Sequence, residues 1–424
     1  MRGFVIGSIA FFVVSVCCSV ALCAVAASDG ESLPQNDRRY EAIKKNFRSN
    51  IYPVFERQKW HLINYEGEKA CESRYDSIKV FIHGNTYSLI AMQGNEYFAI
   101  DEKGVGKQLS IPDGFDIEEV LSCPKDFLLL RNIQKMKEYS PYRGYDVRGY
   151  DMQSNSFVTD YIGMASWSGD TICGIIPEEN NSEKTQFVAY RIENGKSIVL
   201  ENSNEYSRGA VIGNFIIAEK KGDGHRGRGE IFDLNFNKLL SPGRHYAFGW
   251  LPANDNKIVM VFRVPDKEPH FGFIDGISGG IIANGYKQVL PFSNSMAKVQ
   301  CQDGQYGFIE TNGDLAVSCQ FTHASKFKFD VAFVSHAKNS KIFAIDRVGE
   351  HLFDLPFSPD QVVSLDSLIS YGVALYRENT RRQSPFPPDS PPVSMQLRNL
   401  DGKVIWETTS QKDIDVMRNC PLYN

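Results

Sequence analysis

The chain has 424 residues, of which 42% are hydrophobic and 23% charged, proportions that exclude general disorder and are typical of a globular protein. Its 46 Lys and Arg residues against 51 Asp and Glu residues give a formal net charge of −5 at pH 7. This mildly acidic balance argues against broad binding of nucleic acid or anionic membranes, so we expect no nucleic-acid partner.

Residues 1–27 are predicted to be a signal peptide. Arg2 is followed by an apolar run from Phe4 to Ala27 that contains no charged residue, and the small residues Ala24, Ala26 and Ala27 suit signal peptidase. The run is also long enough to span a bilayer, so an uncleaved signal anchor is the alternative. In both cases we expect the chain to be exported, as a periplasmic or secreted protein. It would contact the membrane only through residues 1–27, and only if this segment stays uncleaved.

Residues 28–57 are predicted to be an N-terminal linker with a short amphipathic helix. Between Asp37 and Phe47, the apolar residues Tyr40, Ile43 and Phe47 recur at helical spacing among charged residues. We assign residues 58–410 to a repeat domain and residues 411–424 to a C-terminal tail. The proline-rich stretch 384–392 cannot continue a central strand, so it is predicted to be an extended loop in the last repeat.

A period of 35 residues marks the C-terminal half of the repeat domain. The sequence Phe-Gly-Phe-Ile-Asp at 271–275 becomes Tyr-Gly-Phe-Ile-Glu at 306–310, and the same shift takes Phe292 to Phe327. A weaker third copy ends at Asp346. Each copy alternates apolar with small or polar residues and then reaches a Gly or Asn-Gly turn, a pattern that predicts short strands joined by tight hairpins.

The acid that ends this motif recurs along most of the chain. An aromatic residue follows it by 16 or 17 positions at Phe81, Trp167, Trp250, Phe292 and Phe327. We interpret Trp167, Trp250, Phe292 and Phe327 as blade-packing residues, and the acids as groups that accept hydrogen bonds from turn amides. The motif positions are Asn64, Asp101, Asp151, Glu193, Asp233, Asp275, Glu310, Asp346 and Asp401.

All-strand units of about 40 to 50 residues are typical of propeller blades. We therefore predict an all-β fold, a β-propeller of seven or eight blades. Eight blades result if the first and last motif positions share one blade. An open solenoid of β-hairpins is the alternative architecture.

Residues 271–350 resemble WG repeats, whose pattern runs aromatic-Gly-x-Ile-Asp, a Gly turn, a Tyr and then Phe-x-x-x-x-Ala-x-Val. The first copy continues with Gly279, Tyr286, Phe292, Ala297 and Val299. The tryptophan that gives the family its name is Phe or Tyr here, and the other copies are degenerate. The resemblance implies a bacterial, non-catalytic repeat module, and it supplies no catalytic residues.

Six cysteines lie beyond the leader: Cys71, Cys123, Cys173, Cys301, Cys319 and Cys420. An even number in an oxidising compartment favours disulfides, but spacing alone leaves their pairing open. No two of them form a close metal-type pair, so we expect no metal site. We also expect Cys301 and Cys319 to stay apart, because their strands flank the 306–310 strand on opposite sides, about 9.5 Å apart.

One loop carries a local positive charge. Lys220, Lys221, His225, Arg226 and Arg228 surround Gly-rich sequence in a predicted hairpin. The string at 222–227 matches Gly-x-Gly-x-x-Gly, but a strand follows it instead of a helix, so we predict no dinucleotide site and no cofactor. A solvated turn is one interpretation of this loop, and an anion-contact loop is the other.

No catalytic residue emerges from the sequence. The string Gly-x-Ser-x-Gly around Ser278 falls on the repeat's hairpin turn, where a nucleophile elbow would need a following helix. We therefore expect an exported, non-catalytic repeat protein that binds a protein or a cell-envelope polymer. A propeller enzyme acting on a polysaccharide, as lyase or hydrolase, is one alternative. A structural accessory subunit of an envelope complex is the other.

Overall fold

The computed structural model describes residues 35–423, apart from residue 49 and the segments 84–85, 122–126, 135–145, 153, 169, 179–180, 194–195, 204, 213, 222–228, 241–245, 249–256, 263–269, 276–277, 279, 338–339 and 379–393. The signal segment and the proline-rich stretch lie outside the described residues, so both assignments remain predictions.

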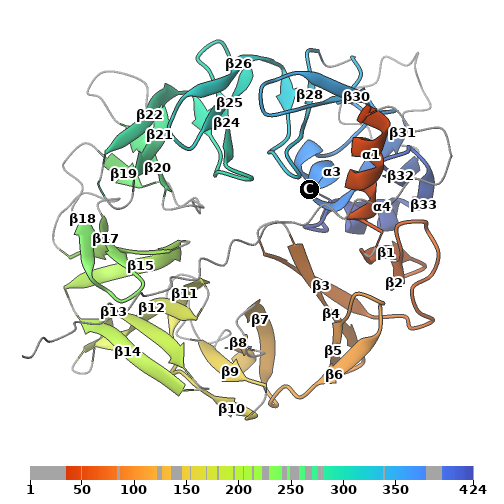
Figure 1. The fold of residues 1–424 in the computed structure, drawn as a ribbon. Helices are drawn as coiled ribbons and strands as arrows, with labels where there is room; N and C mark the ends of the chain where they lie inside the picture. The colour runs from red at the N-terminus through yellow and green to blue at the C-terminus, as the bar shows by residue number, and fades with distance from the viewer. Residues whose placement is uncertain are drawn as a thin grey trace, which may run out of the picture.

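Seven four-stranded antiparallel sheets follow one another along the chain and stand around a ring (Figure 1). In each sheet the strands pair in chain order, and β6, β10, β14, β18, β22 and β26 lie on the outside of the ring. This arrangement confirms the predicted β-propeller. The strands are β3 (Ser77–His83), β4 (Thr86–Gln93), β5 (Glu96–Ile100), β6 (Gly106–Leu109); β7 (Phe115–Leu121), β8 (Phe127–Asn132), β9 (Val147–Asp151), β10 (Ser156–Phe157); β11 (Gly163–Ser168), β12 (Thr171–Glu178), β13 (Asn181–Glu193), β14 (Lys196–Ser203); β15 (Tyr206–Ile212), β16 (Phe215–Lys220), β17 (Gly229–Asp233), β18 (Lys238–Leu240); β19 (Tyr246–Phe248), β20 (Lys257–Phe262), β21 (His270–Asp275), β22 (Ile281–Tyr286); β23 (Gln288–Val289), β24 (Met296–Gln300), β25 (Tyr306–Glu310), β26 (Leu315–Phe321); and β27 (His323–Ala324), β28 (Ala332–Ser335), β29 (Phe343–Ile345), β30 (His351–Asp354).

Two smaller sheets complete the ring. The three-stranded sheet β31 (Val373–Glu378), β32 (Ser394–Asn399) and β33 (Val404–Thr408) neighbours the hairpin of β1 (Tyr52–Glu56) and β2 (Lys59–Ile63). The first and last motif positions therefore lie in separate sheets and do not share a blade. Among the described residues, seven sheets have the four strands of a complete propeller blade.

At several motif positions the acid closes the hairpin between the third and fourth strands, whereas after Glu310 it is Asn312 that accepts a turn amide, from Asp314 (2.9 Å). The Asp346 Oδ1 atom accepts hydrogen bonds from the amides of Val348 (3.0 Å) and Glu350 (2.9 Å). Asp101 and Asp233 accept two turn amides in the same way. In the last sheet this position belongs to Asn399, which accepts from the amide of Lys403 (3.1 Å). Asp401, the residue we assigned from sequence, lies within that turn.

The glycine of this hairpin lies so close to the preceding unit that a side chain would not fit there. A Cβ atom at Gly104 would lie 2.7 Å from the Cβ of Ala70, and one at Gly349 would lie 3.1 Å from Val317 Cγ1. A Cβ at Gly67, whose φ is +86°, would lie 2.8 Å from the carbonyl oxygen of Ile405 in β33. The hairpin after β2 thus meets the last sheet through the same contact that other neighbouring units use.

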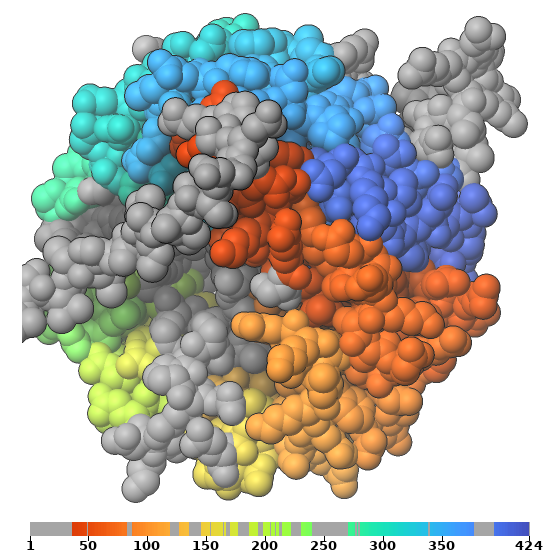
Figure 2. Space-filling model, turned by 45° about the vertical axis from the view of Figure 1, so that its right-hand side comes forward, coloured from red at the N-terminus to blue at the C-terminus, as the bar shows by residue number. Residues whose placement is uncertain are grey.

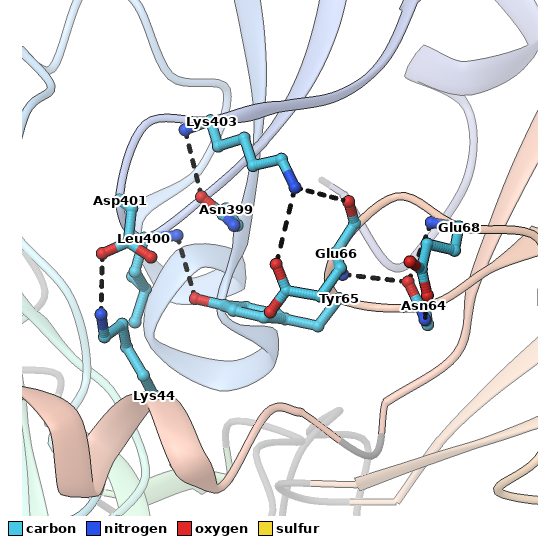
Figure 3. A network of polar contacts seen from close by, with 9 residues as sticks. All are labelled: Lys44, Asn64, Tyr65, Glu66, Glu68, Asn399, Leu400, Asp401 and Lys403. Carbon is cyan, nitrogen blue, oxygen red and sulfur yellow. Dashed lines mark hydrogen bonds and ion pairs between the residues drawn. The ribbon is translucent and has the colours of Figure 1, made fainter.

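Polar contacts reinforce this closure (Figure 3). The Lys403 ammonium donates to the backbone oxygen of Glu66 (3.0 Å), and the Leu400 amide donates to the hydroxyl of Tyr65 (3.3 Å). Lys44 pairs with Asp401 at 2.9 Å. These bonds join residues more than 300 positions apart. In the described part of the chain no strand of the first sheet pairs with a strand of the last sheet, so side-chain contacts make this closure.

Three helices attach to this closure: α1 (Gln35–Lys45), α3 (Leu365–Tyr371) and α4 (Gln411–Arg418). The α1 segment lies where we predicted an amphipathic helix, and its Ile43 is buried together with Phe47. In Figure 2 the red N-terminal residues lie against the light-blue and blue residues from the end of the chain. The sequence did not predict α3, which lies within the repeat domain. Nor did it predict α4, whose Ile414 and Met417 are buried in the region assigned to a tail.

The aromatic positions of the repeat fill the spaces between strands. Phe292 and Phe327 are each 1% exposed, and their rings contact Phe273 and Phe308 at centroid distances of 4.8 and 4.7 Å. The side chains of Trp167 and Trp250 lie outside the described residues.

Our expectation that Cys301 and Cys319 stay apart is wrong, because they form a disulfide with a Cα–Cα distance of 6.2 Å. Cys301 lies beyond β24, in the turn where its amide bonds to the Gln305 carbonyl. Between the two cysteines lies Gly307, where a Cβ atom would sit 3.0 Å from Cys319 Sγ. The bridge therefore crosses over β25 at a residue without a side chain. Of the other described cysteines, Cys71, Cys173 and Cys420 are free thiols, and Cys123 lies outside the described residues.

Candidate functional site

A cavity of about 900 Å³ opens where the segment after α1, the helix α3 and the inner hairpins meet. The hairpins are those between β23 and β24 and between β27 and β28, and the turn after β5 forms another wall. The lining is mixed, with aromatic rings, side-chain amides and charged groups. It includes Asn46, Phe47, Asn50, Tyr87, Asp101, Glu102, Lys103, Asn294, Lys328, Phe329, Ser370 and Tyr371.

Lys328 brings a buried ammonium group to this cavity. Its residue is 8% exposed, and its Nζ atom donates a hydrogen bond to the backbone oxygen of Ser370 in α3. The rings of Phe47 and Phe329 lie 5.5 and 4.8 Å from the nitrogen, measured to their centroids, within the range of cation–π contacts. Burial, together with the nearby charge of Lys326, lowers the pKa of Lys328 to about 8.

The hairpin after Lys328 is strained. Phe329 and Asp330 have φ values of 55° and 58°, and the matching pair in the preceding blade, Asn294 and Ser295, has 56° and 60°. Asn tolerates this left-handed conformation, whereas a bulky Phe rarely adopts it. The Phe329 ring packs against Phe47 of the N-terminal segment at 5.6 Å. Tertiary contacts thus hold a costly backbone conformation at the cavity wall, a situation that is common at functional sites.

Asp330 ties the cavity mouth together. It accepts a hydrogen bond from Asn294 Nδ2 (2.8 Å) and pairs with Arg347 (3.4 Å). Arg39 of α1 donates to the Asp330 backbone oxygen at 3.3 Å. Two neighbouring blades and the N-terminal helix are therefore fixed relative to one another around the opening.

A second group of charges lies at the start of α3. Asp366, in the first turn of that helix, pairs with Lys298 Nζ (3.0 Å) and accepts the backbone amide of Lys326 (2.5 Å). The ammonium of Lys298 also donates to the Ala324 carbonyl (2.8 Å). Burial lowers the pKa of Lys326 although Asp366 acts in the opposite direction. These contacts anchor α3 on the inner edge of two blades and so position Ser370.

The anion-contact loop predicted from sequence lies mostly outside the described residues. His225, Arg226 and Arg228 fall in or at the edge of that part, with no side-chain placement. Lys220 ends β16 and lies 3.8 Å from Glu205, and the amide of Lys221 donates to the Glu205 backbone oxygen (2.7 Å). The anion-contact role of this loop therefore remains a prediction.

The catalytic-looking string at Ser278 forms part of a turn. The Ser278 amide and hydroxyl donate to Asp275 Oδ1 at 2.8 and 3.0 Å. Within the residues that the structure describes, no group of three His, Cys, Asp or Glu side chains could hold a metal ion. In the same part of the chain, no helix is long and apolar enough to cross a membrane.

Sequence reasoning missed Lys328 and Phe329 as site residues. The 35-residue shift aligns Phe329 with Asn294 and therefore pointed to a hairpin turn at both places. The sequence signal for this site was the bulky Phe329 at a turn position where the neighbouring repeat has Asn294. The contribution of α3 and of the segment after α1 to the cavity had no signal in the repeat pattern.

Comparison with known proteins supports the repeat assignment. The family model described as the WG containing repeat matches residues 306–339, which span β25 to the segment after β28. No curated protein matches the chain.

Several solved structures resemble the fold at low similarity. The Dos1 propeller is 12% identical, with 78% of this chain and 94% of that one covered and a TM-score of 0.33. The propeller domain of the Trilobed protease from Pyrococcus furiosus is 11% identical, with coverage of 72% and 97% and a TM-score of 0.32. An uncharacterized protein, lmo1340 from Listeria monocytogenes EGD-e, is 12% identical, with coverage of 66% and 95% and a TM-score of 0.38. The propeller assignment here rests on the sheet arrangement itself.

Proposed function

We propose that this repeat propeller is an exported, non-catalytic module that binds a protein or a cell-envelope polymer through the cavity beside α1 and α3. The cavity of about 900 Å³ is the observation that carries the proposal. Ligand sites are concave, largely preformed and lined by aromatic residues with a few polar groups. The strained Phe329 and the three-way contact of Asp330 are consistent with a preformed mouth.

The lining suits a ligand segment with an apolar face and hydrogen-bonding groups. Phe47, Phe329, Tyr87 and Tyr371 offer ring surfaces, and Tyr87 and Tyr371 contact each other edge to face at 5.3 Å. The amides of Asn46 and Asn50 add polar groups at the rim. A side chain of a partner protein or a sugar ring of a polymer has this combination of an apolar face and polar edges.

Blocking the cavity tests the binding site. Lys103 lies in the turn after β5 at the cavity wall and is exposed, so Lys103→Trp should obstruct the opening. Val348 occupies the equivalent turn position after β29, is 68% exposed and does not line the cavity, so Val348→Trp is the matched control. We expect the first variant to retain less binding to isolated envelope polymer and envelope proteins than the second, with equal melting temperatures. Equal retention by both variants would contradict the proposed site.

Export is tested separately by expressing the full chain in a bacterial host. Mass spectrometry of the protein recovered from the periplasm or medium should show a new N-terminus near residue 28. A full-length, membrane-bound product would indicate the signal anchor instead, and a full-length cytoplasmic product would contradict export.

A further inference from the structure

Beyond binding, the cavity contains a lysine amine in an environment that favours nucleophilic chemistry. Lys328 Nζ is buried, faces the cavity, and is held at a fixed place by the Ser370 carbonyl. We propose that Lys328 is a modification site whose amine forms an imine with a small aldehyde that carries an apolar or aromatic group.

Two features of the surroundings activate the amine. Desolvation in an apolar pocket and a neighbouring cation both favour the neutral form of a lysine, which is the form that attacks carbonyl groups. Both are present here, because the Phe47 and Phe329 rings surround the nitrogen and Lys326 is two residues away in the same segment. Burial and the Lys326 charge lower the pKa of Lys328 to about 8.

The charged groups around Lys328 come from four elements. The turn after β5 contributes Asp101, Glu102 and Lys103 to the cavity lining. Asp366 of α3 is engaged by Lys298 and by the Lys326 amide. Asp330, two residues after Lys328 in the hairpin, contacts Asn294 and Arg347. Arg39 of α1 donates a hydrogen bond to the Asp330 backbone oxygen. The pKa of Lys328 is lowered first by burial and then by the positive charge of Lys326.

The reaction is a condensation without net oxidation or reduction. The nitrogen lone pair attacks the carbonyl carbon, and the carbonyl electron pair moves to oxygen to give a carbinolamine. The two amine hydrogens then leave with that oxygen as water, and the C=N bond forms. The ring surfaces of Phe47 and Phe329 accommodate the apolar group of the aldehyde.

Reductive trapping tests the proposal with the intact protein. Benzaldehyde is added over pH 6 to 10 with cyanoborohydride, which donates hydride to the imine, and peptide mapping by mass spectrometry measures the labelling of each lysine. We expect Lys328 to react at least about tenfold faster at pH 8 than the exposed Lys341, because an ordinary lysine with a pKa of about 10.4 is mostly protonated there. Its labelling should reach half of its maximum near pH 8.

Two variants give controls. Lys328→Arg keeps the positive charge and should lose the fast site while retaining its melting temperature. Lys103→Trp should slow labelling at position 328 without affecting Lys341, whereas Val348→Trp should leave both rates unchanged. Labelling of Lys328 no faster than that of Lys341, or a half-maximal pH equal to that of exposed lysines, would overturn the proposal. This outcome is separate from the proposed binding function, since trapping requires no natural ligand.

Discussion

Asp346 shows why an acid recurs at the end of the third strand of each unit. Its side chain accepts two turn amides, so an acceptor oxygen at a fixed distance from the backbone is the requirement. Asn64 and Asn399 serve the same purpose without a charge.

The first prediction therefore separates hydrogen bonding from charge. Asp346→Ala should lower the free energy of unfolding by about 1 kcal/mol, the usual cost of losing such a side-chain cap. Asp346→Asn should retain most of the stability, as measured by urea unfolding. An equal loss in both variants would show that the negative charge matters instead.

Asp116 predicts a dependence on pH. Burial raises the pKa of Asp116. Hydrogen bonds from Lys79 (2.7 Å) and Tyr97 (2.8 Å), together with the Lys79 charge, lower it by more, so the net pKa is below the usual value. A lowered pKa in the folded state stabilises the protein above the unfolded-state value of about 3.9, and this contribution disappears as the pH falls through the folded-state pKa.

The wild type should therefore lose more stability than Asp116→Asn between pH 6 and pH 3. We expect a difference of about 1 kcal/mol, because the pair is partly exposed and screened by solvent. Urea unfolding at both pH values measures it. Identical losses in the two proteins would show that Asp116 contributes nothing to the acid sensitivity.

The hairpin of β25 and β26 illustrates how one element is reinforced from outside its ladder. The disulfide closes a separation of 18 residues across Gly307, and by chain-entropy arguments a loop of this size stabilises the folded state by about 3 kcal/mol.

Reduction should accordingly lower the melting temperature of the wild type. The double variant Cys301→Ser with Cys319→Ser should melt at a similarly reduced temperature and should not respond to reductant. Calorimetry with and without reductant measures both effects. A wild type that melts at the same temperature in both conditions would contradict a stabilising disulfide.

For the ring as a whole, the C-terminal segment acts as part of the closure. The Tyr423 hydroxyl donates to the Pro53 carbonyl (2.8 Å), and Met417 Sδ accepts the amide of Phe55 (3.3 Å). Both bonds connect α4 and its extension to β1, so the last residues hold the first sheet in place.

Deleting residues 411–424 should therefore destabilise the protein by at least about 5 kcal/mol, because several fully buried side chains are lost at about 1.5–3 kcal/mol each. Tyr423→Phe should cost about 1 kcal/mol, the contribution of one hydrogen bond. Lys412→Ala, at an exposed position, is the control. The losses in free energy of unfolding, measured with urea, should fall in this order for the three variants. A truncated protein as stable as the control would show that residues 411–424 are a tail without a structural role.

Local patterns in the sequence determined the blades. A hairpin needs only alternating apolar residues, an acceptor and a flexible turn, and all of these lie within one 35-residue unit, as in 306–310 with Gly313. For the same reason the burial of Phe292 and Phe327 could be predicted from their shared register.

The tertiary structure alone decided the closure, the cysteine pairing and the cavity. Lys44 and Asp401 are 357 residues apart, and no local pattern records which distant segments meet. The disulfide forms because Cys301 lies in a turn and because Gly307, between the two cysteines, has no side chain. An estimate from the spacing of flat strands includes neither feature. Lys328 became a site residue because Phe47, in the segment after α1, and Ser370 of α3 lie against it. These contacts are set by packing between elements rather than by the repeat.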